Sequence, residues 1–85
     1  MAEVQIYVTR TCPYCVAARR LFDAKGIAYE LIDVTGDAHT RAWLRDVTGR
    51  HTVPQIFIDG RPYGGYTDVA ALDRFGELDR LLGIV

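Results

Sequence analysis

Hydrophobic and polar positions follow two different periods along the chain, and the first half predicts a strand, a helix and a second strand. Val4–Val8 is a short β-branched and aromatic run typical of a buried strand. A helical pattern then begins at Pro13 and stops at Gly26. Its inward positions are Ala18, Leu21 and Phe22. Residues 28–34 predict the second strand, and such a unit of about 30 residues places its two strands parallel.

The middle of the chain predicts one more helix and a hairpin. Asp37 can cap a helix that ends at Gly49. A third strand is expected at residues 53–58. The dipeptide Asp59-Gly60 then signals a tight hairpin turn into a short strand at residues 61–63. A proline inside that last strand indicates the edge of the sheet.

A third helix is expected after the double glycine Gly64-Gly65, with Thr67 or Asp68 as its N-cap residue. Its inward face is predicted to hold Val69, Leu72 and Phe75. Residues 77–82 could add a final helical turn. The order βαβ-α-ββ-α implies an α/β protein with a four-stranded mixed sheet flanked by three to four helices. No linker or repeat interrupts this order, so residues 1–85 are predicted to form one domain.

Composition and charge exclude several classes of protein. Ten basic against eleven acidic residues give a net charge of -1, whereas nucleic-acid binders normally carry a strong basic excess. No apolar run approaches the roughly 18 residues of a membrane span. The first residues, Met1-Ala2-Glu3-Val4, contain neither the basic nor the apolar part of a signal peptide. We therefore expect a cytoplasmic protein that binds neither nucleic acid nor membrane.

The chain contains two cysteines, Cys12 and Cys15, separated by two residues. Small secreted scaffolds usually carry four to eight cysteines that close long loops. A bridge across so short a loop would stabilise the fold little. The pair therefore calls for a chemical explanation.

The predicted helix start supplies that explanation. With Cys12 at the N-cap and Pro13 at the first helical position, the free N–H groups of Tyr14 and Cys15 can point at the Cys12 sulfur. These donors and the helix dipole favour thiolate over thiol, which lowers the pKa of Cys12. Cys15 lies one turn inside the helix, where it can resolve a mixed disulfide formed on Cys12.

Two simpler interpretations compete with redox chemistry. A zinc site would need two more ligands, and the two histidines of the chain, His39 and His51, match no zinc-finger spacing. Alternatively, the cysteines are small hydrophobic residues without a chemical role. The helix start and the βαβ context favour the redox interpretation over both.

Three motifs resemble the dithiol glutaredoxin family. They are Cys12-Pro13-Tyr14-Cys15 after the first strand, Thr52-Val53-Pro54 before the third, and Gly64-Gly65 followed by Asp68. The resemblance covers essentially the whole chain, and the order and spacing are most similar to small bacterial members. It implies a thioredoxin fold and a glutathione-dependent thiol–disulfide oxidoreductase in which Cys12 and Cys15 are catalytic.

The resemblance also implies a set of glutathione-binding residues. In the family, the proline at Pro54 is cis and the backbone at Val53 pairs with the cysteinyl part of glutathione, beside Thr52. Gly65 lets the ligand approach closely. At the γ-glutamyl end the matching residues are Thr67 and Asp68, at a helix start that binds carboxylates. A strand-starting proline and a plain helix cap are the simpler alternatives for Pro54 and Asp68.

The glycyl end of the implied site departs from the family pattern. The family usually has a lysine three residues before the first cysteine, where this chain has Thr9. Arg10 could replace it only if the loop turns its side chain suitably. Arg41 matches a family position that contacts the glycyl carboxylate, and a solvated helix arginine is the alternative. Tyr14 could shield the mixed disulfide, and Tyr66 stands where a third cysteine is common.

The resemblance finally implies partners. Glutathione is the expected co-substrate, and no metal or nucleotide is expected. Glutathionylated or disulfide-containing proteins are the expected substrates, with ribonucleotide reductase as one candidate, and glutathione reductase would act indirectly. We expect a monomer. Two rival functions remain open: a redoxin reduced by thioredoxin reductase, and a carrier in which two chains and two glutathiones bridge an iron–sulfur cluster.

Overall fold

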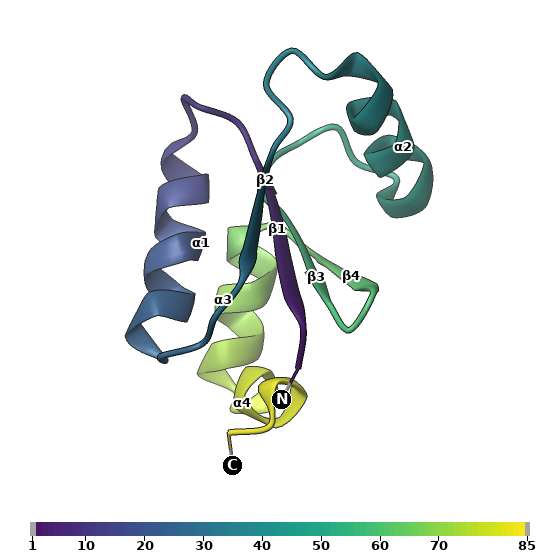
Figure 1. Ribbon diagram of the computed structural model, residues 1–85. Helices are drawn as coiled ribbons and strands as arrows, with labels where there is room; N and C mark the ends of the chain where they lie inside the picture. Colours follow the sequence, from purple (N-terminus) through teal and green to yellow (C-terminus); the bar gives the residue numbers. More distant parts are fainter. Residues whose placement is uncertain (1, 85) are drawn as a thin grey trace.

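A computed structural model describes residues 2–84, so Met1 and Val85 of the predicted domain lie outside the described residues. Figure 1 shows a central sheet with helices on both of its faces. The elements in chain order are β1 (Val4–Val8), α1 (Pro13–Ala24), β2 (Glu30–Asp33), α2 (Ala38–Thr48), β3 (Gln55–Ile58), β4 (Arg61–Gly64), α3 (Tyr66–Arg74) and α4 (Glu77–Leu82). This order is the predicted βαβ-α-ββ-α arrangement.

The sheet is mixed and has the strand order β2-β1-β3-β4. Strands β1 and β2 are parallel, as a helical crossover requires, and Ile6 pairs with Leu31. Strands β1 and β3 are antiparallel, as are β3 and β4. The short strand that contains Pro62 is at the edge, where the missing N–H disrupts no ladder. The predicted four-stranded mixed sheet is therefore confirmed.

Each face of the sheet buries its own hydrophobic cluster. The larger cluster lies under α1, α3 and α4, and it joins sheet residues such as Ile6 and Ile56 to Phe22, Val69 and Leu82 of the helices. The smaller cluster lies on the opposite face under α2. Its four buried members are Tyr7, Val34, Leu44 and Phe57. Helix α2 therefore rests on a much smaller core than the other helices, whereas Val53 of the loop that follows it packs against both clusters.

Two helices begin and end as the sequence predicts. Pro13 is the first residue of α1, and Cys12 is its N-cap in an extended conformation. Asp37 caps α2 by accepting a hydrogen bond from the N–H of Thr40 at 3.0 Å, and Gly49 ends the helix in the left-handed conformation. The predicted hairpin turn is also present, with positive φ angles at Asp59 (53°) and Gly60 (79°).

Two predicted strands are shorter in the structure. The strand expected at residues 28–34 covers Glu30–Asp33, and the strand expected at 53–58 covers Gln55–Ile58. Proline has no N–H to donate to a ladder, so pairing in the latter begins only after Pro54. β-Branched composition alone could not locate these ends.

The start and end of α3 also correct the prediction. Its N-cap is Gly65, and neither Thr67 nor Asp68 holds that position. Asp68 is the third helical residue, and its carboxylate reaches back to accept the N–H of Gly65 at 3.0 Å. Phe75, expected to face inward, is 81% exposed. The helix ends at Arg74, so its period no longer directs the side chain of the following residue into the core.

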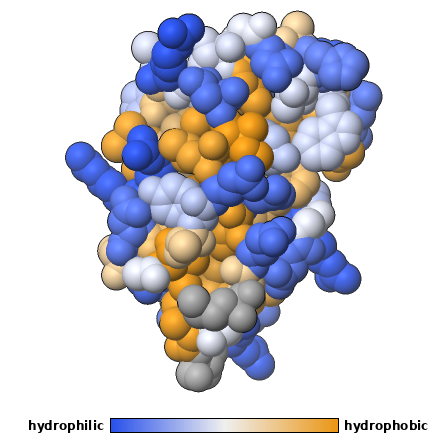
Figure 2. All heavy atoms as spheres, in the orientation of Figure 1, coloured by the Kyte–Doolittle hydropathy of each residue, from blue (hydrophilic) through white to orange (hydrophobic). Residues whose placement is uncertain are grey.

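Hydrophilic side chains stand out along both flanks of the molecule in Figure 2, and hydrophobic residues show between them. Several large hydrophobic side chains are partly exposed, including Leu31 of β2 and Val47 of α2. Within residues 2–84, no helix is both long and apolar enough to cross a lipid bilayer.

Candidate active site

The two cysteines form a disulfide at the start of α1. The N–H of Cys15, one of the two donors expected from the sequence, lies 3.1 Å from the Cys12 sulfur and donates to it. The Cys15 side chain is only 3% exposed, whereas Cys12 is partly exposed. The two sulfurs therefore differ in environment: one is reachable and faces the helix N-terminus, and the other is enclosed in the larger core cluster.

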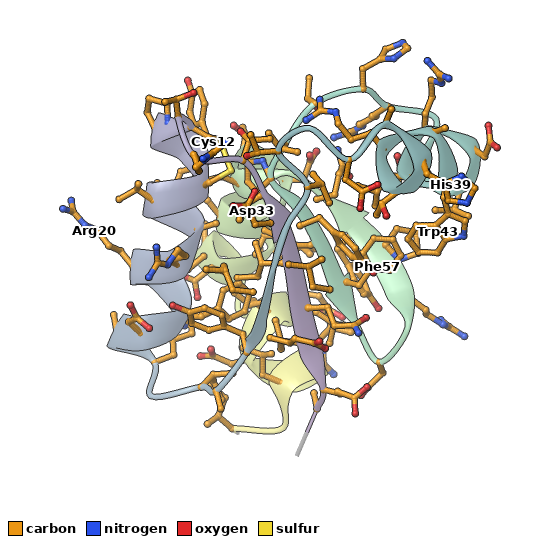
Figure 3. The ribbon with its side chains drawn as sticks, turned by 45° about the horizontal axis from the view of Figure 1, so that its top comes forward. Cys12, Arg20, Asp33, His39, Trp43 and Phe57 are labelled. Atoms are coloured by element: carbon orange, nitrogen blue, oxygen red, sulfur yellow. A yellow bond between two sulfur atoms is a disulfide. The ribbon has the colours of Figure 1, made fainter. Side chains whose placement is uncertain are left out.

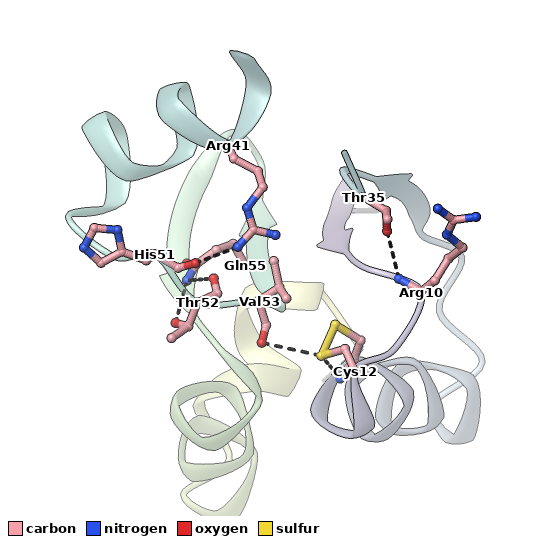
Figure 4. Close-up of a disulfide and its surroundings, with 9 residues drawn as sticks. Arg10, Cys12, Thr35, Arg41, His51, Thr52, Val53 and Gln55 are labelled. Atoms are coloured by element: carbon pink, nitrogen blue, oxygen red, sulfur yellow. Dashed lines mark hydrogen bonds between the residues drawn. A yellow bond between two sulfur atoms is a disulfide. The ribbon is translucent and has the colours of Figure 1, made fainter. Parts of the chain in front are cut away.

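A loop before β3 faces this disulfide from across the site. The Val53–Pro54 peptide bond is cis, as the resemblance implied. The carbonyl oxygen of Val53 lies 3.6 Å from the Cys12 sulfur, and Figure 4 shows the two groups directed toward one another. A molecule attached to Cys12 would thus have the Val53 backbone beside it.

Two side chains bind successive carbonyl groups of that loop. The Arg41 guanidinium, from α2, donates to the carbonyl oxygen of His51 at 3.0 Å. The Gln55 side-chain amide, from β3, donates to the carbonyl oxygen of Thr52 at 2.8 Å (Figure 4). The loop is therefore tied on two sides, to a helix and to the sheet.

A groove of about 290 Å³ begins beside the disulfide and runs to the start of α3. Seven of the eight glutathione-binding residues expected from the resemblance line it, and Arg41 is the exception. They are Tyr14, Thr52, Val53, Pro54, Gly65, Thr67 and Asp68. Two further residues, Arg50 and Tyr66, complete the lining. Segments more than 50 residues apart in the sequence thus meet in one surface depression.

Arg50 is the charged residue of the groove that sequence reasoning missed. Its guanidinium lies 2.6 Å from the Asp68 carboxylate. This hydrogen bond, together with the N–H of Gly65, holds the pKa of the Asp68 carboxyl below its usual value. The far end of the groove therefore presents a paired cation and anion. Arg50 follows the Gly49 cap and immediately precedes the His51–Pro54 segment, which was the available signal.

The double glycine lets the start of α3 approach these groups. A Cβ atom on Gly64 would lie 2.5 Å from an Asp68 carboxylate oxygen and 3.0 Å from the Arg50 guanidinium, and its φ of +95° disfavours other residues. A Cβ on Gly65 would lie 3.3 Å from the Pro54 carbonyl oxygen. The glycines therefore already serve close contacts within the protein itself, beyond the ligand contact expected from the resemblance.

The two arginines considered for the glycyl end are placed differently. Arg10 lies on the β1–β2 side, where its backbone N–H donates to the Thr35 hydroxyl at 2.9 Å. In Figure 4 the Arg10 guanidinium points away from Cys12. Arg41 instead extends from α2 toward the His51–Val53 loop. It also lines a separate hollow of about 340 Å³ on α2. Arg41 is thus nearer to the loop that borders the groove.

Aromatic residues form two groups around the site. Tyr14 and Tyr66 lie side by side at the groove, with ring centroids 6.3 Å apart, and Tyr14 is 62% exposed. Trp43 of α2 is 44% exposed and stacks on Phe57 of the sheet (Figure 3). This second group lies away from the disulfide in Figure 3, and its Phe57 belongs to the smaller core cluster.

The histidines and acidic residues of the described part of the chain form no metal-binding cluster. Within residues 2–84, no group of three or more His, Cys, Asp or Glu side chains is placed to hold a metal ion. His39 lies exposed on α2, and His51 is exposed in the loop. Neither histidine lines the groove beside the disulfide.

Comparison with known proteins gives concordant results. The family profile described as Glutaredoxin matches residues 4–62. Glutaredoxin 3 of Escherichia coli (strain K12) is 46% identical over 82 residues, which cover 96% of this chain and 99% of that protein. A protein named Glutaredoxin from Pseudomonas aeruginosa is 44% identical over 82 residues, covering 96% of this chain and 98% of that protein.

Solved structures agree with the sequence comparison. A buckwheat glutaredoxin–glutathione complex superposes with a TM-score of 0.91 at 34% identity, covering 96% of this chain and 77% of that one. The solution structure of glutaredoxin from Brucella melitensis gives a TM-score of 0.87 at 40% identity, covering 99% and 91%. These likenesses confirm the predicted thioredoxin fold.

Proposed function

The chain belongs to the glutaredoxin family and is a glutathione-dependent thiol–disulfide oxidoreductase, and from this premise we propose how its residues divide the work. Cys12 is the nucleophile and Cys15 is the resolving thiol. The observation that carries this assignment is the Cys12 sulfur at the N-cap of α1, 3.1 Å from the N–H of Cys15. A thiolate is stabilised there, and the thiolate is the attacking species.

The reaction on a protein–glutathione mixed disulfide takes two exchanges. The Cys12 thiolate attacks the glutathione sulfur, a Cys12–glutathione disulfide forms, and the protein substrate leaves as a thiolate. The thiolate of a second glutathione then attacks the bound glutathione sulfur, which yields oxidised glutathione and restores the Cys12 thiolate. Neither exchange uses Cys15.

A disulfide within a protein substrate requires the second cysteine. After Cys12 attacks one sulfur, Cys15 gives up its proton and attacks the Cys12 sulfur, so that the substrate leaves reduced and the Cys12–Cys15 disulfide closes. Two glutathiones reopen it. The buried position of Cys15, 3% exposed and one helical turn from Cys12, supports this internal role.

Glutathione is proposed to lie along the groove with its sulfur at Cys12. The Val53 backbone would pair with the cysteinyl residue between Thr52 and the cis-Pro54, in the manner of strand addition. Tyr14 would cover the mixed disulfide on its exposed side. A relative was crystallised as a glutathione complex, which supports glutathione as the co-substrate here.

The charged end of the groove suits the γ-glutamyl group. Asp68 would pair with the ammonium, and the free N–H groups of Thr67 and Asp68 at the start of α3 would bind the α-carboxylate. Gly65 leaves room for close approach, and Arg50 keeps Asp68 ionised and oriented. At the other end, Arg41 is the residue proposed to face the glycyl carboxylate.

We further propose that the chain acts as a monomeric single domain, residues 1–85, in the cytoplasm. A redox-active Cys-x-x-Cys pair in an otherwise cysteine-free chain suits a reducing compartment. Its substrates would be glutathionylated or disulfide-containing proteins, with ribonucleotide reductase as a candidate. Glutathione reductase would restore the glutathione pool. No metal, nucleotide, nucleic acid or membrane has a part in the proposal.

A coupled assay tests the proposal. The reduced protein is mixed with glutathione, glutathione reductase, NADPH and a small glutathione mixed disulfide, and NADPH oxidation is followed. We expect turnover that depends on both glutathione and Cys12. Turnover supported by thioredoxin reductase, but not by glutathione, would contradict the proposed role of the groove.

A further inference from the structure

Gln55 is the exception in the buried part of the chain. Among residues 2–84 it is the single buried residue with a polar side chain, and its exposed fraction is 0%. Its neighbours along β3 are Ile56, Phe57 and Ile58, all buried. A buried amide loses its hydration and regains stability only through hydrogen bonds, so it needs a specific partner.

The hydrogen bonds of Gln55 satisfy only half of its amide. The Nε2 group donates to the Thr52 carbonyl oxygen at 2.8 Å and lies 3.4 Å from the Thr52 hydroxyl. Its Oε1 has no partner among the described residues. An apolar side chain of similar size would avoid that loss. Gln55 therefore stabilises the core less than an apolar residue would, but it makes a specific hydrogen bond to the loop.

The hydrogen bond from Gln55 reaches the loop that borders Cys12. Thr52 directly precedes Val53, whose carbonyl oxygen lies 3.6 Å from the Cys12 sulfur. Within residues 2–84, no other side chain hydrogen-bonds to Thr52. Gln55 also pairs with Tyr7 across the sheet, so its backbone is fixed by β1. A rigid strand thus holds a loop residue in place through one buried amide.

We propose that Gln55 is a positioning residue for glutathione. It presets the Thr52–Val53 backbone so that pairing with the cysteinyl residue costs less ordering of the loop. The inference rests on the proposed function, because it assigns a role to the Val53 backbone in that site. It predicts that the amide contributes to glutathione recognition and contributes little to the stability of the fold.

The experiment compares Gln55→Met with Ile58→Val. Methionine fills a similar unbranched volume and removes the amide. Ile58 is buried at the other end of the same strand and belongs to the larger core cluster, so its truncation weakens the core without removing a hydrogen bond to the loop. For each variant we would measure KM for glutathione, kcat, the urea midpoint, and NMR order parameters of the Thr52 and Val53 amides in the reduced protein.

For Gln55→Met we expect KM to rise about 3-fold to 10-fold, the scale of one lost hydrogen bond. We expect kcat to stay within about 2-fold, the urea midpoint to be equal or higher, and the order parameters to fall. Ile58→Val should lower the midpoint and leave KM unchanged. An unchanged KM, or unchanged order parameters, in Gln55→Met would overturn the proposal, as would a KM that follows stability in both variants. The order parameters do not depend on turnover, so they also separate a failure of this proposal from a failure of the proposed function.

Discussion

The two ends of the groove are built by different means. At the cysteine end, the groups around the disulfide are positioned by the backbone and by burial. Cys15 is 3% exposed, Pro54 is buried, and Cys12 caps a helix. At the γ-glutamyl end, position comes from charge: the side chains of Arg50 and Asp68 are 49% and 42% exposed and bind one another. In the proposed function, the first end fixes the geometry of the reaction and the second attracts the charged γ-glutamyl group.

This difference has energetic consequences. Interactions between exposed charges contribute about 0–1 kcal/mol and weaken with salt. A nucleophile, in contrast, has no substitute once its sulfur is removed. Substitutions at the cysteine end should therefore change the chemistry itself. Substitutions at the charged end should change the concentration of glutathione at which the chemistry occurs.

The largest expected effect separates the two cysteines. Cys12→Ser should abolish all turnover, since no thiolate remains at the N-cap of α1. Cys15→Ser should retain turnover with a glutathione mixed disulfide and lose it with a protein disulfide, since only the latter needs the resolving thiol. The coupled assay measures both. Full activity in the Cys12 variant would refute the assigned roles.

The next effect concerns the reactivity of Cys12. In reduced Cys15→Ser protein, the rate of alkylation by iodoacetamide as a function of pH reports the Cys12 thiol alone. We expect a midpoint at least about one pH unit below the reference thiol pKa of about 8.5, because helix N–H groups stabilise the thiolate. A midpoint near the reference value would mean that the N-cap position does not activate the sulfur.

A smaller effect is expected at the charged end. Asp68→Asn removes the anion that is proposed to pair with the glutathione ammonium, and it should raise KM for glutathione about 3-fold to 10-fold with kcat unchanged. The matched control is Asp73→Asn, since Asp73 lies on the same helix but pairs with Lys25, away from the groove. High salt should reduce the difference in KM for glutathione between wild type and Asp68→Asn. An equal rise in both variants would assign the effect to the helix.

The pH dependence of stability gives a second test of Asp68. Its pKa is lowered in the folded protein by Arg50 and Gly65, so its contribution is complete above the unfolded-state carboxyl pKa of about 3.9. That contribution is lost as the pH falls through the lower folded-state value. The difference in unfolding free energy between wild type and Asp68→Asn should therefore be constant near neutral pH and shrink in acid. A difference independent of pH would contradict the ion pair.

The smallest effect is expected at Arg41. Arg41→Ala removes one of the two side chains that bind the loop and should raise KM for glutathione about 2-fold to 4-fold. Arg45→Ala is the control, because Arg45 lies one turn along α2 and lines the same hollow without binding the loop. Equal KM values in the two variants would make Arg41 a solvated helix residue.

Local signals in the sequence were sufficient for most of the fold. Pro13 and Asp37 mark helix starts, Gly49 marks an end, and Asp59-Gly60 marks a hairpin, because each acts through its own backbone or that of a near neighbour. The predictions were wrong where a contact with another residue decides where a helix begins. Thr67 or Asp68 was expected to cap α3, but the helix begins earlier and the Asp68 carboxylate reaches back to Gly65.

The candidate site was likewise predicted only in part from the sequence. The family resemblance implied eight glutathione-binding residues, and the fold gathers seven of them along one groove. Arg50 and Gln55 were missed because their partners depend on folding: Arg50 binds a residue 18 positions away, and Gln55 sits in a strand pattern where its polarity gave no reason to suspect a loop contact. Contacts of single side chains that form only on folding leave no periodic trace in a sequence.

The small size of the core cluster under α2 should make the neighbouring wall of the groove less stable to heating. That cluster has four buried side chains, one of which is Leu44 of α2 itself, and the helix leads through Gly49 into the segment that forms one wall of the groove. Regions with few buried contacts open before the whole molecule unfolds. On warming, we expect α2 amides to exchange with deuterium earlier than those of α1, and affinity for glutathione to fall before the disulfide end loses its structure. Uniform protection across both helices would contradict this order of melting.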